Sequence, residues 1–228
     1  MLSNFSLFNS LLALVILLPF SSASPKVPVA LYKRAVASPS NPVPPSLDLF
    51  YTAPTNYELA VPGEILRIRV APGNLTSIVG NSSAAYNILY RTTNTRYKPS
   101  WAVTTLFIPL FNTTSPTPNS TAARSALLSY QFPYDSVDVD ASPSYTFYSD
   151  PLRSWSDVSL ALGRGWYVNV PDYEGPTASF IAGVQEGHAI LDSVRAVLSS
   201  GFGLTADVSY ALWGYSGGSI ASEWAAEV

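Results

Sequence analysis

The chain has 228 residues, 47% of them hydrophobic, and a formal net charge of −3. This length and apolar content suffice for one sizeable core, so a single globular domain is expected. Only 12% of the residues are charged, cysteine is absent and there is one histidine. The composition therefore argues against nucleic acid as a partner, against disulfides or a cysteine nucleophile, and against a His-rich metal site. No cofactor is expected.

The N-terminal region indicates export. Residues 11–20 are an apolar run about half as long as a membrane span requires, and the small residues 21–24 follow it. This pattern predicts a signal peptide over residues 1–23 and a secreted, extracellular protein, with an uncleaved anchor as the alternative. Residues 24–45 are predicted to be a pro-segment and Pro-rich linker, in which Lys33-Arg34 marks either a processing site or a solvated charge pair. No later stretch is long and apolar enough to span a bilayer.

Four N-glycosylation sequons follow in segments rich in Gly, Ser, Thr and Pro, which are typical of surface loops. Their acceptor residues are Asn74, Asn81, Asn112 and Asn119. A secreted chain is expected to carry glycans on some of them.

Residues 46–228 are predicted to form the folded domain. Strand-like runs rich in β-branched and aromatic residues are expected at 65–70, 85–92 and 102–110, and shorter buried strands at 126–131 and 165–170. A helix is expected at 180–199. Its apolar positions repeat every 3.6 residues, and they are Phe180, Ile181, Val184, Leu191, Val194 and Leu198. From residue 126 onward the alternation of strands and helices predicts a parallel sheet with flanking helices.

The sequence Gly214-Tyr215-Ser216-Gly217-Gly218 fits the G-x-S-x-G nucleophile elbow. The run 208–213 before it is predicted to be a buried strand, and residues 219–227 after it a helix. The sharp turn between them exposes the serine hydroxyl, and the backbone N–H of Gly217 is placed to donate to an oxyanion. The alternative is a glycine-rich strand-to-helix turn that holds a bystander serine.

A serine on this elbow needs a histidine and an acid from later in the chain, and the twelve residues after Ser216 contain neither His nor Asp. The one histidine, His188, falls in the predicted helix 180–199. A catalytic base belongs on a loop over the strand ends. We therefore interpret His188 as a hydrogen-bonded helix residue and not as the base.

Three acidic residues follow predicted strands. Asp135 comes just after the strand 126–131, where an α/β-hydrolase places its second oxyanion donor, but an ordinary turn aspartate fits the position as well. Asp172 and Glu174 follow the strand 165–170. They either line the site or form a turn beside Gly175.

Taken together, these motifs resemble the fungal secretory lipase family of the Candida antarctica lipase A type, over roughly residues 46–228. The resemblance rests on several short matches in one order. They are Tyr90-Arg-Thr-Thr, Ala102-Val-Thr-Thr-Leu-Phe-Ile-Pro, Ser129-Tyr-Gln, Tyr134-Asp-Ser, Asp172-Tyr-Glu-Gly, Phe180-Ile-Ala-Gly and Gly214-Tyr-Ser-Gly-Gly.

Membership of this family would imply an α/β-hydrolase fold with a mostly parallel sheet, a lid domain, and hydrolysis of triacylglycerols and other carboxylic esters at a lipid–water interface. It would imply Ser216 as the nucleophile and Asp135 with the Gly217 N–H as the oxyanion hole. Family members continue through a lid, a triad aspartate and a triad histidine, so the chain resembles an N-terminal portion that is expected to be inactive alone.

The sequence thus predicts a secreted serine-type triacylglycerol lipase or carboxylic ester hydrolase. Two alternatives stay open. The elbow also fits a serine carboxypeptidase or an acyltransferase on the same fold, because the chemistry depends on the pocket. The chain also fits a non-catalytic secreted glycoprotein that keeps the first half of this fold.

Overall fold

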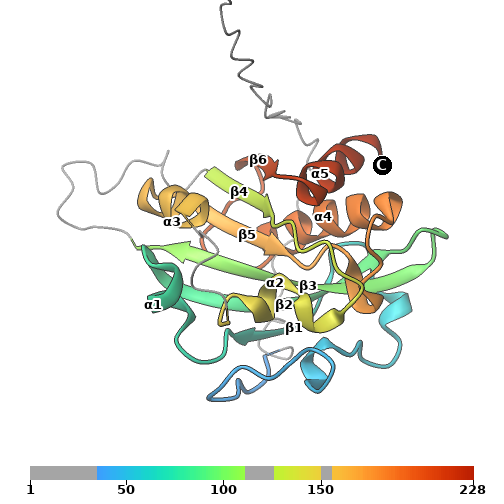
Figure 1. The fold of residues 1–228 in the computed structure, drawn as a ribbon, viewed down its shortest axis with the longest axis horizontal. Coiled ribbons are helices and arrows are strands. Elements are labelled where there is room, and N and C mark those ends of the chain that lie inside the picture. Colours follow the sequence, from blue (N-terminus) through green and yellow to red (C-terminus); the bar gives the residue numbers. More distant parts are fainter. Residues whose placement is uncertain (1–34, 111–125, 150–155) are drawn as a thin grey trace, which may run out of the picture.

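A computed structural model describes residues 35–110, 126–149 and 156–228 (Figure 1). The predicted signal peptide, most of the predicted pro-segment including Lys33-Arg34, and the sequons at Asn112 and Asn119 lie outside the described residues. The proposed division of the chain at residues 23 and 45 therefore stays a prediction.

The centre of the fold is one six-stranded sheet in the order β1-β2-β3-β5-β4-β6. The strands are β1 (Ile65–Val70), β2 (Ser82–Thr93), β3 (Pro99–Pro109), β4 (Ala126–Gln131), β5 (Tyr167–Pro171) and β6 (Ser209–Gly214). Each predicted strand is present, and the predicted bounds of β1 and β4 agree with the structure.

The sheet is mixed, and not mostly parallel as the family resemblance implied. Strands β1, β2 and β3 form an antiparallel meander, and β3 pairs antiparallel with β5. The hairpin between β2 and β3 turns at Asn94, whose side-chain oxygen accepts from the backbone N–H groups of Arg96 and Lys98. The paired residues extend from Thr93 and Pro99, next to the turn, to Ser82 and Pro109 at the other end. Strand β2 is therefore longer at both ends than its apolar run predicted, and β3 begins earlier.

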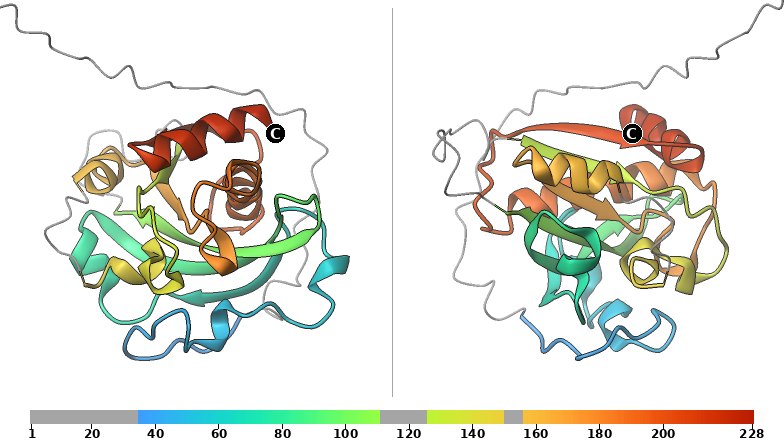
Figure 2. Two further views of the ribbon diagram at one scale, coloured as in Figure 1. Left: turned by 45° about the vertical axis from the view of Figure 1, so that its right-hand side comes forward. Right: turned by 60° about the vertical axis from the view of Figure 1, so that its left-hand side comes forward.

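The second half of the sheet follows the prediction. Strand β4 lies between β5 and β6 and pairs parallel with both. The connection from β4 leads to β5 on one side of it in the sheet. The connection from β5 then leads past β4 to β6 on its other side. Helix α3 (Ser156–Gly163) covers one face of the sheet, and α4 (Gly183–Leu198) and α5 (Gly217–Glu227) cover the other (Figure 2). Such a reversal at the carboxyl ends of parallel strands is where α/β proteins place their sites.

Helix α4 is shorter at its start than predicted. Phe180 and Ile181 precede it and are exposed, because Ile181 adopts a φ of 60° in the turn before the helix. The first turns of α4 pack closely on α5. A Cβ on Gly187 would stand 2.6 Å from the backbone oxygen of Trp224, and a Cβ on Gly183 would overlap the indole of the same residue. The two glycines therefore let the helices approach.

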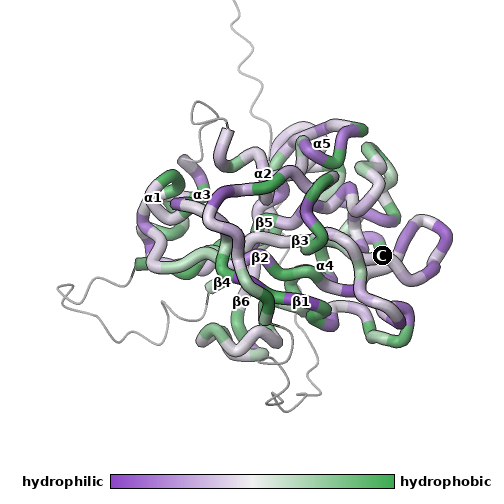
Figure 3. Tube along the Cα trace, turned by 90° about the horizontal axis from the view of Figure 1, so that it is seen from below, coloured by the Kyte–Doolittle hydropathy of each residue, from purple (hydrophilic) through white to green (hydrophobic). Residues whose placement is uncertain are grey.

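The core lies between the sheet and its helices, with side chains from both halves of the sheet. Leu106, Phe107, Val168, Val170 and Ile190 are all fully buried. Hydrophobic and hydrophilic stretches alternate along the strands, helices and loops (Figure 3). Two short helices, α1 (Leu75–Val79) and α2 (Pro143–Thr146), complete the fold. Within the described ranges, no helix has the length and apolar character needed to cross a membrane.

Candidate active site

Ser216 occupies the turn between β6 and α5 that the sequence predicts. Its backbone has φ 50° and ψ −125°, a conformation that residues with a Cβ seldom adopt. The side chain is exposed at the start of α5. The N–H groups of Gly218, Ser219 and Ile220 donate to the backbone oxygens of Tyr215 or Ser216, whereas the first amide of α5, that of Gly217, comes before any residue of the turn that could pair with it inside the helix. The backbone of Ser216 therefore has the strained geometry of a nucleophile elbow.

The glycines of the motif are explained by lack of space. The turn folds α5 back onto the end of β6, so that a Cβ on Gly214 would stand 2.6 Å from the backbone carbonyl of Gly218 and 2.8 Å from the oxygen of Gln131. A Cβ on Gly218 would overlap the same Gln131 oxygen. Both neighbours are backbone, which cannot move aside as a flexible side chain can. Any side chain at either position would push the elbow open.

Gln131, the last residue of β4, braces the elbow. It is fully buried and pairs in register with Gly214. Its amide oxygen accepts from the backbone N–H of Trp213 at 3.2 Å and from the hydroxyl of Ser222 at 2.9 Å. One side chain thus joins β4, β6 and α5. The role of Gln131 was not predicted; the signal in the sequence was an amide residue at the end of the predicted strand 126–131.

Asp135 lies next to Ser216, as the resemblance implied. One carboxyl oxygen, Oδ2, is 3.5 Å from the Ser216 hydroxyl oxygen, a long contact. The other oxygen lies over Gly217, where any Cβ would overlap it. Asp135 is exposed, and its own backbone is left-handed with φ 44°. The structure therefore gathers Ser216, Asp135 and Gly217 at the ends of two neighbouring strands.

The aromatic ring contact of His188 is with Tyr97. His188 lies on α4, and its ring meets the edge of the Tyr97 ring in the β2–β3 turn with 5.8 Å between centroids. Burial lowers the pKa of His188, and the nearby Asp192 acts in the opposite direction. This environment holds the imidazole neutral within a helix packed on the sheet.

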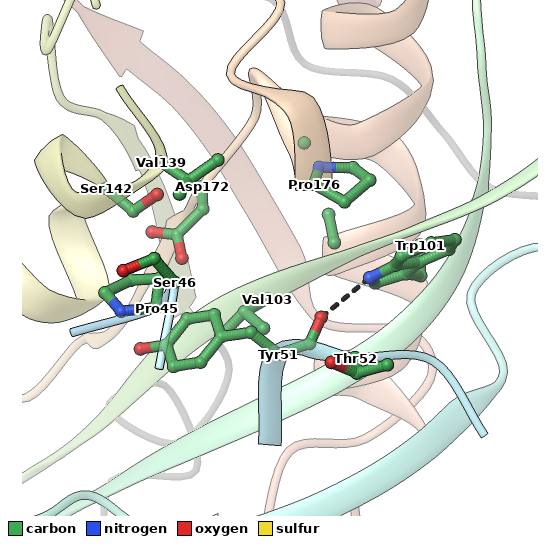
Figure 4. A pocket seen from close by; sticks show the side chains of 12 residues that line it. Pro45, Ser46, Tyr51, Thr52, Trp101, Val103, Val139, Ser142, Asp172 and Pro176 are labelled. Carbon is green, nitrogen blue, oxygen red and sulfur yellow. Dashed lines mark hydrogen bonds between the residues drawn. The ribbon is translucent and has the colours of Figure 1, made fainter. Parts of the chain in front are cut away.

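Asp172 and Glu174 lie in the loop that follows β5 and have different neighbours. Asp172 accepts from the backbone N–H of Ser144 at 2.9 Å and from its hydroxyl at 2.6 Å, and that hydroxyl is 2.8 Å from the Tyr51 hydroxyl. Burial raises the pKa of Asp172 to about 7. Its carboxyl group lines a cavity of about 170 Å³ together with Tyr51 and Trp101 (Figure 4). Ser216 does not line this cavity, so it is separate from the elbow.

Glu174 and Glu186 are buried carboxyl groups behind Asp135. Burial, with smaller contributions from the charges of Glu186 and Asp135, raises the pKa of Glu174 to about 8. Burial likewise raises the pKa of Glu186 to about 7. Both side chains therefore hold protons near neutrality. Across the described ranges, no group of three or more His, Cys, Asp or Glu residues is arranged to hold a metal ion.

Of the two described sequons, one is more open than the other. Asn74 is exposed before α1, and its side chain makes no capping hydrogen bond. The Asn81 amide nitrogen donates to the backbone oxygen of Ser159 at 3.0 Å and to its hydroxyl at 3.1 Å. A glycan on Asn81 would take one of these hydrogens.

Known proteins resemble this chain in sequence and in fold. The profile of the Secretory lipase family matches residues 155–228. The trichothecene C-3 esterase of Fusarium sporotrichioides is 58% identical over 200 residues, which are 85% of this chain and 44% of the esterase. A probable inactive lipase of Mycobacterium tuberculosis is 38% identical over 82% of this chain and 42% of its own length.

A solved structure is also similar to this chain. Candida antarctica lipase A in its closed state superposes with a TM-score of 0.69 at 34% identity, over 80% of this chain and 42% of the lipase. The chain therefore spans less than half the length of these relatives. Within that span the chain shares the α/β-hydrolase fold of Candida antarctica lipase A, and in sequence it is similar to the secretory lipase family.

Proposed function

We propose that Ser216 is the nucleophile of a secreted carboxylic ester hydrolase. The observation that carries the proposal is the strained turn at Ser216, which exposes the hydroxyl beside the Gly217 amide and the Asp135 carboxyl group. Strain of this kind, of order 1–3 kcal/mol, persists where the surrounding structure fixes it, and it concentrates at functional sites. The Gly214 and Gly218 contacts are what fix it here.

In the proposed reaction the Ser216 oxygen attacks the ester carbonyl carbon, and its proton passes to a histidine base. The carbonyl oxygen becomes an oxyanion that accepts from the Gly217 N–H and from Asp135. The base then protonates the departing alcohol, and water releases the acid from the acyl-enzyme.

The base is proposed to lie outside these 228 residues. His188 is the one histidine in the chain, and its ring packs on Tyr97. The relatives extend over more than twice the matched length. We propose that the histidine and its acid partner lie in that additional length. The 228-residue chain alone is accordingly proposed to be inactive.

The substrate is proposed to be an ester of an alcohol. The motifs of the sequence favour triacylglycerols, and the similarity to Candida antarctica lipase A supports that class. The relative that is 58% identical is named a trichothecene C-3 esterase, which favours a trichothecene ester. Emulsified triolein and a trichothecene C-3 ester, assayed side by side, distinguish these substrates.

The nucleophile is tested in the protein encoded by the complete gene. Ser216→Ala is expected to abolish fluorophosphonate labelling and hydrolysis of p-nitrophenyl butyrate. Ser209→Ala, an exposed serine at the far end of the same strand, is the matched control and is expected to keep both. His188→Ala is expected to keep both as well. Loss of activity in His188→Ala would overturn the assignment of the base.

The alternative from another class is a non-catalytic glycoprotein, which the similarity to a probable inactive lipase favours. In that case the wild-type protein takes up no fluorophosphonate label. Labelling with turnover of a peptide or an acyl acceptor in place of water would indicate the carboxypeptidase or acyltransferase alternative. Export is tested separately by N-terminal sequencing of secreted material, which is expected to begin near residue 24 or, after processing, near residue 35.

A further inference from the structure

Two tyrosines join the loop that carries Asp135 to the loop that follows β5. The hydroxyl of Tyr173 donates to the backbone oxygen of Phe132 at 2.9 Å. In the opposite direction, the backbone N–H of Glu174 donates to the Tyr134 hydroxyl at 2.6 Å. Each loop thus contributes one tyrosine and one backbone group. We call this pair of hydrogen bonds the tyrosine clasp.

The clasp is buried and tightly packed. Tyr134 is 7% exposed and Tyr173 is 1% exposed, and their rings meet edge to face with 5.0 Å between centroids. Burial raises the pKa of both phenols, so both stay neutral and keep their hydroxyl hydrogens. Because the two hydroxyl groups are excluded from solvent, water cannot replace either hydrogen bond, and breaking one leaves a buried polar group unsatisfied.

The β5 loop is itself held in place from two sides. Asp172 is bonded through both carboxyl oxygens to Ser144 at the start of α2. The Glu174 backbone oxygen accepts from the Gln185 side chain on α4 at 2.8 Å and from the backbone N–H of Ser179 at 2.9 Å. The clasp therefore ties the Asp135 loop to a part of the molecule that is already anchored.

Asp135 needs such support. Its φ of 44° is unfavourable for a residue with a Cβ, and its side chain is exposed, so its own contacts do not hold it. It directly follows Tyr134, whose backbone N–H donates to the same Phe132 oxygen that Tyr173 reaches. The position of the Asp135 carboxyl group over Gly217 thus depends on where the clasp sets the residues before it.

We propose that Tyr134 and Tyr173 are positioning residues of the oxyanion site, which hold the Asp135 carboxyl group over the Gly217 amide. The inference rests on the proposed function of Ser216 and deepens it. Neither tyrosine touches the reacting atoms. Their effect on turnover passes entirely through the placement of Asp135, where a displacement of about 1 Å can cost on the order of 100-fold in rate.

The test is a double-mutant cycle in the protein encoded by the complete gene. Tyr173→Phe removes one hydroxyl and keeps the ring. It is expected to lower kcat for p-nitrophenyl butyrate by about 10- to 100-fold and to leave KM within about twofold. Tyr134→Phe, which leaves the Glu174 N–H without its acceptor, is expected to act in the same way. Inactivation by a phosphonate ester, whose oxygen takes the oxyanion position, is expected to slow in parallel.

The decisive comparison uses Asp135→Ala. In that background Tyr173→Phe is expected to lower kcat no further, because the residue through which it acts is gone. The matched control is Tyr90→Phe, which also removes a buried hydroxyl bonded to a backbone oxygen, that of Ala189 at 2.8 Å. Tyr90→Phe is expected to lower the melting temperature as Tyr173→Phe does, with kcat unchanged.

The outcomes separate the two proposals. If Tyr173→Phe lowers kcat equally with and without Asp135, or no more than Tyr90→Phe does, the clasp is structural only and the inference is overturned. If hydrolysis by the wild-type protein does not depend on Ser216, the proposed function fails and the inference fails with it.

Discussion

Replacement of Gly214 by alanine tests whether lack of space is what fixes the elbow. An added Cβ would stand 2.6 Å from the carbonyl carbon and oxygen of Gly218 and 2.8 Å from the Gln131 oxygen, where ordinary contacts begin at 3.4 Å. The backbone on one or both sides must therefore move by up to 0.8 Å, the difference between 3.4 and 2.6 Å. Because Gly218 lies two residues beyond Ser216, this movement displaces the nucleophile.

The magnitude follows from that displacement. Inserting a methyl group into a close-packed site typically costs about 1–3 kcal/mol of folding free energy, and misplacing a reacting group by about 1 Å costs on the order of 100-fold in rate. Gly214→Ala is therefore expected to lower the stability of the full-length enzyme by about 1–3 kcal/mol and kcat by one to two orders of magnitude, about 10- to 100-fold.

The assay pairs urea unfolding with p-nitrophenyl butyrate turnover. Gly163→Ala at the end of α3 is the control, because its Cβ would meet only the Asn81 side chain, at 3.1 Å. It is expected to change stability by no more than about 0.5 kcal/mol. A Gly214→Ala protein with wild-type stability and wild-type kcat would refute the argument that backbone contacts shape the elbow.

Three further predictions concern pH, glycans and solubility. Glu174 holds its proton in the folded state up to about pH 8 but in the unfolded state only to its ordinary pKa of 4.5, so stability falls as pH rises between these values. Glu174→Gln is expected to make the fall in melting temperature from pH 5 to pH 8 shallower, and an unchanged slope contradicts this. Asn74→Gln is expected to remove more mass from the secreted protein than Asn81→Gln, and the reverse order contradicts it. The isolated residues 24–228 are expected to aggregate on gel filtration, because β6 pairs only with β4 among the described strands and Trp224 is 40% exposed; a soluble, monodisperse chain contradicts it.

The sequence predicts local features of the fold well because they depend on nearby residues. Strand β4 is a short, mostly apolar run. The elbow is encoded by five consecutive residues, and its glycines stand where a Cβ would meet backbone atoms. The left-handed φ at Ser216 follows from that pattern without any knowledge of the rest of the chain.

The mixed direction of the sheet was harder to predict, because buried strands have the same apolar pattern whether their neighbours run parallel or antiparallel. The signal that was missed is the short connection at Asn94, since a turn of that length joins only antiparallel strands. The start of α4 was misplaced for a different reason. Phe180 and Ile181 continue the apolar period of the helix, but the chain turns at Ile181 before the helix begins.

The clasp could not be predicted from the sequence at all. The chain has 14 tyrosines, and no local pattern says which hydroxyl meets which backbone group about 40 residues away. Asp135 was singled out by its place after a strand and by resemblance. What holds it in position became visible only when the two loops were seen together.

The two halves of the candidate site are therefore stabilised in different ways. Ser216 and Asp135 both have a positive φ, 50° and 44°, and lie beyond the ends of the adjacent strands β6 and β4. Ser216 is held by its own neighbours, Gly214 and Gly218, so its geometry lasts as long as β6 and α5 stay packed together. Asp135 is held by hydrogen bonds across 40 and 41 residues, which break when either loop opens. Mild denaturant is thus expected to disturb the oxyanion site before the nucleophile, so that kcat declines while the backbone of the elbow is still intact.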